Sequence, residues 1–525
     1  MTTSSIVILI AIIIYMVAMV GIGFAVADKN KTSGDFFLGG RTLGPFVTAM
    51  SAEASDMSGW LLMGLPAVAL MGGLPEASWT AIGLAAGTYL NWLFVAKRLR
   101  VYSHKIDAFT IPDFFARRFN DKSKALTVVA AVMIIIFFVP YTASGFSACG
   151  KLFSTLFGMD YLTAMIISAI VIVVYCTLGG FLAASTTDFV QSIVMTVALF
   201  VVIGFGEGAV RGFDNVFHNV QSLTGYLDLF KGFDVSTGTT GNFGALSVFS
   251  TLAWGLGYFG MPHILLRFMA IEDKNKLKLS RRIASVWVVI SMGIAILIGV
   301  IGYSLMKAGL IPTYANSSAA ETIIVDIAKL ISSYGYVPAF VGGIILAGIL
   351  ASTMSTADSQ LLAAASAISQ NIVQETFGVK MSQKKSMLLA RLSVVVISVI
   401  AVFLARDPNS SVFRIVSFAW AGFGAVFGPV VLCALFWKRT NKWGALAGMI
   451  TGGATIFIWK FVVRVKFADT IFNIYELLPA FIVGLIFIIA VSLLTPAPEK
   501  SITDTFDAVK KETKEYFLII KSVVE

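Results

Sequence analysis

The sequence predicts an all-α polytopic membrane protein with about 13 transmembrane helices. Hydrophobic residues make up 57 % of its 525 residues and charged residues only 13 %, against roughly 25 % charged in an average soluble domain. The mean hydropathy is +0.86, and apolar stretches of about 20 residues recur along the whole chain. This composition excludes a soluble enzyme.

The predicted spans follow one another from the first residues to the C-terminal tail. They lie near 5–27, 45–72, 76–96, 125–150, 161–182, 187–206, 244–269, 283–307, 338–372, 387–405, 411–437, 443–463 and 474–495. The first is too long for a signal-peptide core and lacks a small-residue cleavage site, so we expect it to be retained. An odd number of spans predicts that the two termini lie on opposite sides of the membrane.

Basic residues predict the orientation of these spans. With the N-terminus outside, 29 of the 39 Lys and Arg residues fall on loops and helix ends assigned to the cytoplasm. This asymmetry is the positive-inside pattern. It accounts for the formal charge of +10 without a nucleic-acid partner. We expect a multi-pass protein of the cytoplasmic membrane, with the C-terminal tail inside the cell.

Residue types needed for metal or covalent catalysis are scarce. The three Cys lie in apolar runs without C-x-x-C spacing, and the three His form no H-E-x-x-H motif, which excludes a disulfide scaffold and a thiolate metal site. The longest segments between spans, near 207–243 and 309–336, are too short for a catalytic domain. A membrane-embedded sensor or enzyme is the alternative from another class; a large cytoplasmic domain or a nucleophile beside a base would favour it, and neither is visible in the sequence.

The second predicted span carries carboxylates where hydrocarbon is expected. Residues 51–60 (SAEASDMSGW) include Asp56, and a carboxylate at mid-membrane costs roughly 2.5–3.5 kcal/mol, so it should face a cavity or a partner. No Lys or Arg lies in this segment. Glu53 faces either the same site or a water-filled vestibule. Small residues and Pro66 make the segment a poor helix, and a break would expose carbonyl oxygens of the kind that bind Na⁺.

A second polar cluster lies inside the ninth predicted span, at residues 352–360 (STMSTADSQ). Hydroxyls in membrane helices often bond only the carbonyl one turn back. Ser355 and Thr356 are adjacent, however, and Asp358 is close by. Because a cation site needs five or six oxygens, this span could complete a site that the second span begins.

Aromatic residues mark a third feature, at residues 254–263 (WGLGYFGMPH). Trp254 and Tyr258 are four residues apart and would share one helix face, which serves either helix packing or an apolar ring. Pro262 should kink or end the helix. The G-x-G-x-x-G spacing at 255–260 follows no strand, so we reject a dinucleotide site.

Three weaker signals complete the sequence motifs. Tyr141 follows Pro140 in the fourth span, where the proline could aim the phenol. Asp188 follows Ser-Thr-Thr near a short turn, where a helix cap is the simplest interpretation. The spacing of Gly444 and Gly448 favours close helix packing.

Long motifs resemble one known family. Residues 38–46 (LGGRTLGPF), 51–66, 254–263 and 419–424 (AWAGFG) are similar to those of the bacterial sodium:solute symporters, and the resemblance extends from the first span to about residue 495. It implies a leucine-transporter-like fold in which the second to eleventh spans form two inverted five-helix repeats around a midplane site. Alternating access to that site would follow.

The resemblance divides the chain into six regions. These are 1–42 (an extra helix and a cytoplasmic loop), 43–206 (the first repeat), 207–243 (an outer loop), 244–442 (the second repeat), 443–497 (two further helices) and 498–525 (a cytoplasmic tail).

The resemblance also implies roles for single residues. Na⁺ would be bound by the carbonyl oxygens of Ala54, Met57 and Ser352 and by the hydroxyls of Ser355 and Thr356. Ion coupling would involve Asp56 as the essential carboxylate, together with Ser58, Gly59, Arg41 and Asp188. The substrate would lie against Tyr141, Trp254, Tyr258 and Pro262. Ser352 stands where the family commonly has Ala, which a carbonyl ligand tolerates, and Cys176 departs from the family signature.

The function implied is Na⁺-coupled uptake of L-proline, with Na⁺ as the co-transported ion and no organic cofactor. Another small solute, or H⁺ carried by Asp56, would be compatible with the same fold. The lipid bilayer is the other expected partner, and the sequence sets no oligomeric state.

Overall fold

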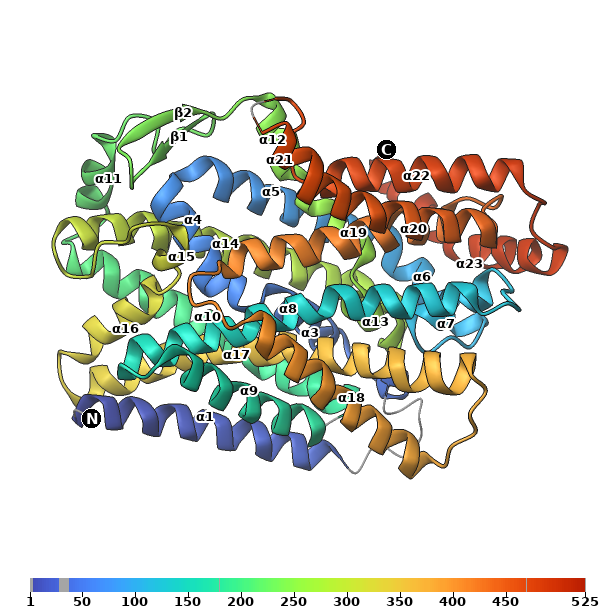
Figure 1. Ribbon diagram of the computed structural model, residues 1–525, viewed down its shortest axis with the longest axis horizontal. Coiled ribbons are helices and arrows are strands. Elements are labelled where there is room, and N and C mark those ends of the chain that lie inside the picture. The colour runs from blue at the N-terminus through green and yellow to red at the C-terminus, as the bar shows by residue number, and fades with distance from the viewer. Residues whose placement is uncertain (1–2, 28–36, 179, 469, 525) are drawn as a thin grey trace.

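Long helices lying side by side make up most of the molecule, and a small β-hairpin covers part of one end (Figure 1). This computed structural model describes residues 3–27, 37–178, 180–468 and 470–524, with side chains up to residue 513 except at 27, 178 and 383. The loop expected after the first span, at 28–36, lies outside the described residues.

The first half of the chain forms helices and the hairpin. They are α1 (Thr3–Ala27), η1 (Gly39–Arg41), α3 (Pro45–Gly59), η2 (Trp60–Gly64), α4 (Leu65–Gly72), α5 (Leu74–Leu90), η3 (Asn91–Val95), α6 (Ala96–Lys105), α7 (Ile111–Arg118), α8 (Ala125–Phe157), α9 (Tyr161–Leu178), α10 (Phe181–Ala209), α11 (Phe213–Gln221), β1 (Lys231–Asp234), β2 (Thr239–Asn242), α12 (Ala245–Leu252), η4 (Ala253–Gly260) and α13 (Pro262–Ala270).

The second half of the chain is helical in its regular structure. Its elements are η5 (Lys274–Lys276), α14 (Leu277–Lys307), α15 (Ser317–Ala320), α16 (Ile323–Ser332), α17 (Tyr336–Ser366), η6 (Ala367–Thr376), α18 (Gln383–Leu404), α19 (Val412–Phe436), α20 (Lys442–Ile458), η7 (Trp459–Val463), α21 (Arg464–Lys466), α22 (Leu477–Leu494) and α23 (Lys500–Val524).

Ten helices in the described part of the chain are long and apolar enough to cross a membrane. They coincide with ten of the predicted spans, so the protein is a multi-pass membrane protein. The other three predicted spans fall on α5–η3–α6, on the shorter helix α9 and on α12–η4–α13. The total of thirteen stays a prediction.

The span formed by α3, η2 and α4 lies at the centre of the bundle. It contacts α8, α10, α14 and α17, and the whole of its most apolar stretch is buried. Helices α1, α18 and α22 lie outside and expose large apolar side chains; Val17 is 66 % exposed, Phe403 67 % and Leu494 86 %. Exposed apolar surface of this extent is typical of helices that face lipid.

Glycine spacing accounts for the close packing of α20 against α22, as predicted. A Cβ at Gly444 of α20 would lie 2.0 Å from Ser492 Oγ, and one at Gly448 would lie 2.2 Å from Ile488 of α22. Without side chains at these two positions, the helix backbones approach each other closely.

The two ends of the bundle differ (Figure 1). The hairpin end carries α11, α15, α16 and the strands β1 and β2, which pair antiparallel with Lys231 opposite Asn242. The tail end carries α6, α7 and the beginning of α23. There, Glu512 of α23 forms an ion pair with Lys274 at 2.5 Å, and Asp507 forms one with Lys438.

Candidate functional site

The central span breaks where the sequence predicts it. Ser58 has φ 48° and ψ −168°, a conformation that residues with a side chain rarely adopt. The Ser58 hydroxyl accepts a hydrogen bond from the Trp60 N–H at 3.1 Å, and the chain continues as the π-helical turn η2. The regular hydrogen bonding of the helix is therefore interrupted at its buried centre.

Three segments meet at Asp56, one turn before the end of α3. The Tyr258 hydroxyl of η4 donates a hydrogen bond to Asp56 Oδ2 at 2.5 Å, and the Tyr141 hydroxyl of α8 donates one to the Asp56 backbone carbonyl at 2.9 Å. All three residues are buried. The structure thus brings together the predicted carboxylate and two of the residues expected to face the substrate.

Aromatic rings form one side of this centre. Trp254 lies 5.7 Å from Trp60 and 6.4 Å from Trp420 between ring centroids, and Trp420 lies 5.0 Å from Tyr258. The Trp420 Nε1–H donates a hydrogen bond to the Trp254 carbonyl at 2.7 Å. A Cβ at Gly257 would lie 1.9 Å from Trp420 Nε1, so only glycine permits this approach.

The prediction that Trp254 and Tyr258 share one face of an α-helix is wrong. Residues 253–260 form the 3₁₀ helix η4, in which positions four apart are a third of a turn away from each other. Both rings contact Trp420 because that residue lies between them. Pro262 occupies the first position of α13, where its missing backbone N–H breaks no hydrogen bond of the helix. A new helix therefore begins at this proline, and the span is broken here as predicted.

Hydroxyls of α17 meet the broken span on its other side. The Ser355 hydroxyl donates hydrogen bonds to the carbonyls of Ala54 at 2.9 Å and Ser352 at 3.2 Å. The Thr356 hydroxyl donates to the Ser352 carbonyl at 3.0 Å. Four of the five residues expected to bind Na⁺ therefore lie within one hydrogen-bonded group, and its oxygens are of the type that a hard cation requires.

The fifth residue and its neighbours belong to the break itself. The carbonyl of Met57 accepts the Trp60 N–H. A Cβ at Gly59 would lie 3.0 Å from the Cβ of Ala148 and 3.6 Å from Thr353 Oγ1. Gly59 therefore lets the broken span approach α8 and α17 closely.

Asp188 lies in a separate buried network nearer the tail end. Its carboxylate Oδ2 accepts hydrogen bonds from Ser51 Oγ at 2.7 Å and from Arg267 Nη2 at 3.0 Å. Arg267 also donates to Ser359 Oγ at 2.5 Å, and both charged side chains are fully buried. The network joins α3, α10, α13 and α17.

The interpretation of Asp188 as a helix cap is wrong. Helix α10 begins at Phe181, so Asp188 lies two turns inside it. The unpaired backbone N–H groups that a capping side chain binds occur only in the first turn of a helix. Its partner Arg267 was not identified as a site residue from the sequence. The available signal was an arginine within the apolar run 264–270 (ILLRFMA), since buried arginines pair with carboxylates.

Arg41 lies at the tail end, outside the spans. Its guanidinium donates hydrogen bonds to the carbonyls of Met269 and Ala108, both at 2.7 Å, and it also contacts Ser103. Burial lowers the pKa of Arg41 to about 10, so it remains charged at neutral pH. Arg41 thus connects the segment before α3 to α6 and α13, and it lies apart from Asp56.

Comparisons with known proteins find relatives over nearly the whole chain. The chain is 42 % identical over 512 residues to the osmoregulated proline transporter OpuE of Bacillus subtilis (strain 168), covering 97 % of this chain and 99 % of that protein. It is 40 % identical to the sodium/proline symporter of Escherichia coli (strain K12), with 95 % of each chain covered. It is 37 % identical to the sodium/proline symporter of Staphylococcus aureus, with 96 % of each covered.

Solved structures share the fold. A Na⁺-coupled sialic acid symporter in a substrate-bound outward-open state superposes with a TM-score of 0.76 at 16 % identity, over 94 % of this chain and 99 % of that one. MhsT in complex with L-phenylalanine superposes with a TM-score of 0.53 at 12 % identity, over 86 % of this chain and 98 % of that one. These similarities show the leucine-transporter-like fold.

The sequence profile of the sodium:solute symporter family matches residues 36–452. This match covers most of the chain and includes both broken spans and the polar cluster of α17. The protein therefore belongs to the sodium:solute symporter family, whose members are transporters and not enzymes.

Proposed function

We propose that this protein carries L-proline into the cell together with Na⁺ by alternating access. The observation that carries the proposal is the hydrogen bond from the Ser355 hydroxyl of α17 to the Ala54 carbonyl of the broken span, at 2.9 Å. Na⁺ bound between these oxygens would join the two helices. Relatives about 40 % identical over nearly the whole chain, which are named sodium/proline symporters, support the choice of ion and substrate.

The substrate in this proposal lies next to Asp56. The rings of Trp254 and Tyr258 supply an apolar surface for the pyrrolidine ring, while the interrupted backbone at Ser58 supplies polar groups for its charged ends. Tyr141 and Pro262 border the same region. Binding of Na⁺ would hold α3 and α17 together and thereby complete the substrate site.

The membrane potential drives this cycle. Moving one positive charge inward down about 100 mV supplies about 2.3 kcal/mol before any Na⁺ gradient is added. In the proposed orientation, the hairpin end faces outward and the tail end faces the cytoplasm, in agreement with the positive-inside pattern. The regions 43–206 and 244–442 would be the two repeats whose relative movement opens each side.

Uptake of radiolabelled L-proline into proteoliposomes tests this function. We expect uptake to require an inward Na⁺ gradient and to be blocked by unlabelled L-proline but not by unrelated solutes. Equal uptake in Na⁺-free acidic buffer would assign coupling to H⁺ carried by Asp56. Na⁺-driven uptake of a different solute would retain the ion site and reject L-proline.

A further inference from the structure

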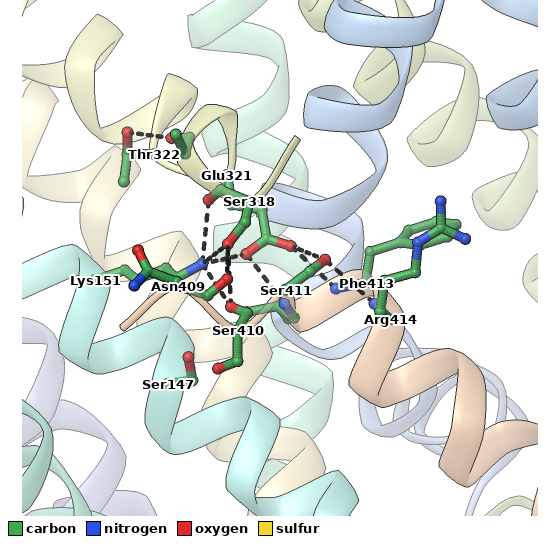
Figure 2. Close-up of polar contacts among 12 residues, drawn as sticks. Ser147, Lys151, Ser318, Glu321, Thr322, Asn409, Ser410, Ser411, Phe413 and Arg414 are labelled. Atoms are coloured by element: carbon green, nitrogen blue, oxygen red, sulfur yellow. Dashed lines mark hydrogen bonds and ion pairs between the residues drawn. The ribbon is translucent and has the colours of Figure 1, made fainter. Parts of the chain in front are cut away.

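Charged side chains connect the two proposed repeats, the regions 43–206 and 244–442, at each end of the bundle. At the hairpin end, Lys151 of α8 pairs with Glu321, which follows α15, at 2.7 Å (Figure 2). Glu321 also accepts hydrogen bonds from the N–H groups of Val412 and Phe413 at the beginning of α19, at 3.0 and 3.1 Å. The side chains of Lys151 and Glu321 are only 7 % and 1 % exposed, so this connection is shielded from solvent.

At the tail end, the two regions are connected through α23. Glu512 of α23 pairs with Lys274 of η5 at 2.5 Å and lies 4.0 Å from Lys105 at the end of α6. Asp507 pairs with Lys438, which lies between α19 and α20. Since Lys105 belongs to the first region and the other two lysines belong to the second, α23 bridges both.

A buried face holds α23 against the bundle. Phe506, Val509 and Thr513 are buried, and their spacing of three and four residues places them on one side of the helix. The guanidinium groups of Arg98 and Arg118 lie 6.0 and 5.4 Å from the centroid of the Phe506 ring. Helix α23 therefore covers two arginines of the first region.

The same two arginines bind the second region. Arg98 Nη1 donates a hydrogen bond to the Leu435 carbonyl at 2.7 Å, and Arg118 Nε donates one to the Ala434 carbonyl at 2.9 Å. Both carbonyls belong to the last turn of α19. Because α23 lies over this junction and pairs with both regions, separation of the regions at the tail end must break the contacts of α23 with one of them.

The charges at the tail end are exposed, unlike those at the hairpin end. Glu512 and Lys274 are 41 % and 33 % exposed, and Asp507 and Lys438 are 51 % and 48 % exposed. The hydrogen bond from Lys274 lowers the pKa of Glu512, so its carboxyl group is charged at neutral pH. Salt screens exposed charges beyond about 10 Å at 0.1 M and screens buried pairs much less. A rise in ionic strength therefore weakens the ion pairs of α23 and leaves the buried pair of the hairpin end almost unchanged.

We propose that α23 is a strap that holds the tail end closed at low ionic strength and releases it as ionic strength rises. The bound strap slows the movement that opens the central site toward the tail end, and it thereby slows uptake. Because loss of cell water concentrates the salt inside, the strap links uptake to the water content of the cell. This inference rests on the proposed function for the transport cycle and for the cytoplasmic location of the tail end.

Uptake at different internal salt concentrations tests the strap. Right-side-out membrane vesicles are loaded with choline chloride at about 0.05 M or about 0.5 M, a range over which the screening length falls about threefold, and sucrose keeps the osmolality equal. External Na⁺ and L-proline are saturating, and rates are divided by the amount of transporter in the membrane. We expect the initial rate of wild-type protein to be about threefold higher at the higher salt concentration, since two exposed ion pairs are weakened.

Charge variants assign the salt response to α23. Asp507→Asn/Glu512→Gln should transport at the higher rate at both salt concentrations. The matched control is Asp504→Asn, which removes an exposed carboxylate of the same helix that forms no ion pair in the described part of the chain, and it should respond to salt as wild type does. Exchange of one pair, in Lys438→Asp/Asp507→Lys, retains the attraction and should also keep the response.

Three results would overturn the strap. These are a wild-type rate that does not change with internal salt, a salt response in Asp507→Asn/Glu512→Gln equal to that of wild type, and a rate in this variant below that of wild type at both salt concentrations. The last result would mean that α23 supports transport instead of slowing it. Absence of Na⁺-driven L-proline uptake by wild-type protein would instead reject the proposed function, so the two failures are distinguishable.

Discussion

Two buried aspartates lie on neighbouring spans, and their surroundings differ. Asp188 pairs with Arg267 at 3.0 Å and also accepts a hydrogen bond from Ser51. Asp56 receives only a tyrosine hydroxyl on its carboxylate, from Tyr258, and forms no ion pair with Lys or Arg among the described residues. A buried charge with a built-in partner stabilises one arrangement of helices. A carboxylate without one is suited to a cation that arrives during transport.

Removal of Arg267 should have the largest effect. Arg267→Gln leaves Asp188 buried without its counter-charge, so we expect the free energy of unfolding to fall by about 3–5 kcal/mol. Thermal unfolding of the purified protein in detergent measures this loss. The double variant Arg267→Gln/Asp188→Asn removes both charges and should recover much of the stability. A double variant as unstable as the single one would contradict the assignment of the pair.

Asp56→Asn should affect transport and spare stability. The amide still accepts the Tyr258 hydroxyl but has lost its charge, and a hydrogen bond to a charged group contributes about 1.5–3 kcal/mol. We expect Na⁺-stimulated uptake at a fixed subsaturating Na⁺ concentration to fall by about 10- to 100-fold, with membrane levels unchanged. Unaltered Na⁺ dependence would remove the distinction between the two aspartates.

Tyr141→Phe should have the smallest effect of the three. It deletes one hydrogen bond to the Asp56 carbonyl, at 2.9 Å, which contributes about 1 kcal/mol. The expected result is a rise of about fivefold in the L-proline concentration for half-maximal uptake. Tyr161→Phe, which loses a hydrogen bond to Ala405 of the α18–α19 connection, is the control and should leave that concentration unchanged. Equal effects of both variants would indicate general loosening of the bundle.

Much of the fold could be predicted because lipid imposes a simple pattern on sequence. The apolar stretches located ten spans, and Ser58 and Pro262 mark breaks that the glycines and prolines predicted. The 3₁₀ geometry of residues 253–260 could not be predicted, since it depends on packing against Trp420.

The candidate site was predictable where polar residues lie within apolar runs, as at Asp56 and Ser355. Contacts between segments that are distant in the chain could not be predicted in this way. Arg267 lies 79 residues from Asp188 in the chain, and no local spacing relates them.

The central claim is that α17 and the broken span bind Na⁺ together, and equilibrium binding of radioactive Na⁺ to the purified protein tests it most directly. The variant is Ser355→Ala/Thr356→Ala. The matched control is Ser366→Ala/Ser369→Ala, which removes two hydroxyls of α17 and η6 that bond only carbonyls one turn back. The account predicts saturable Na⁺ binding in wild type and control and its loss, or at least about a tenfold weakening, in the variant. Equal Na⁺ binding by all three proteins would contradict it.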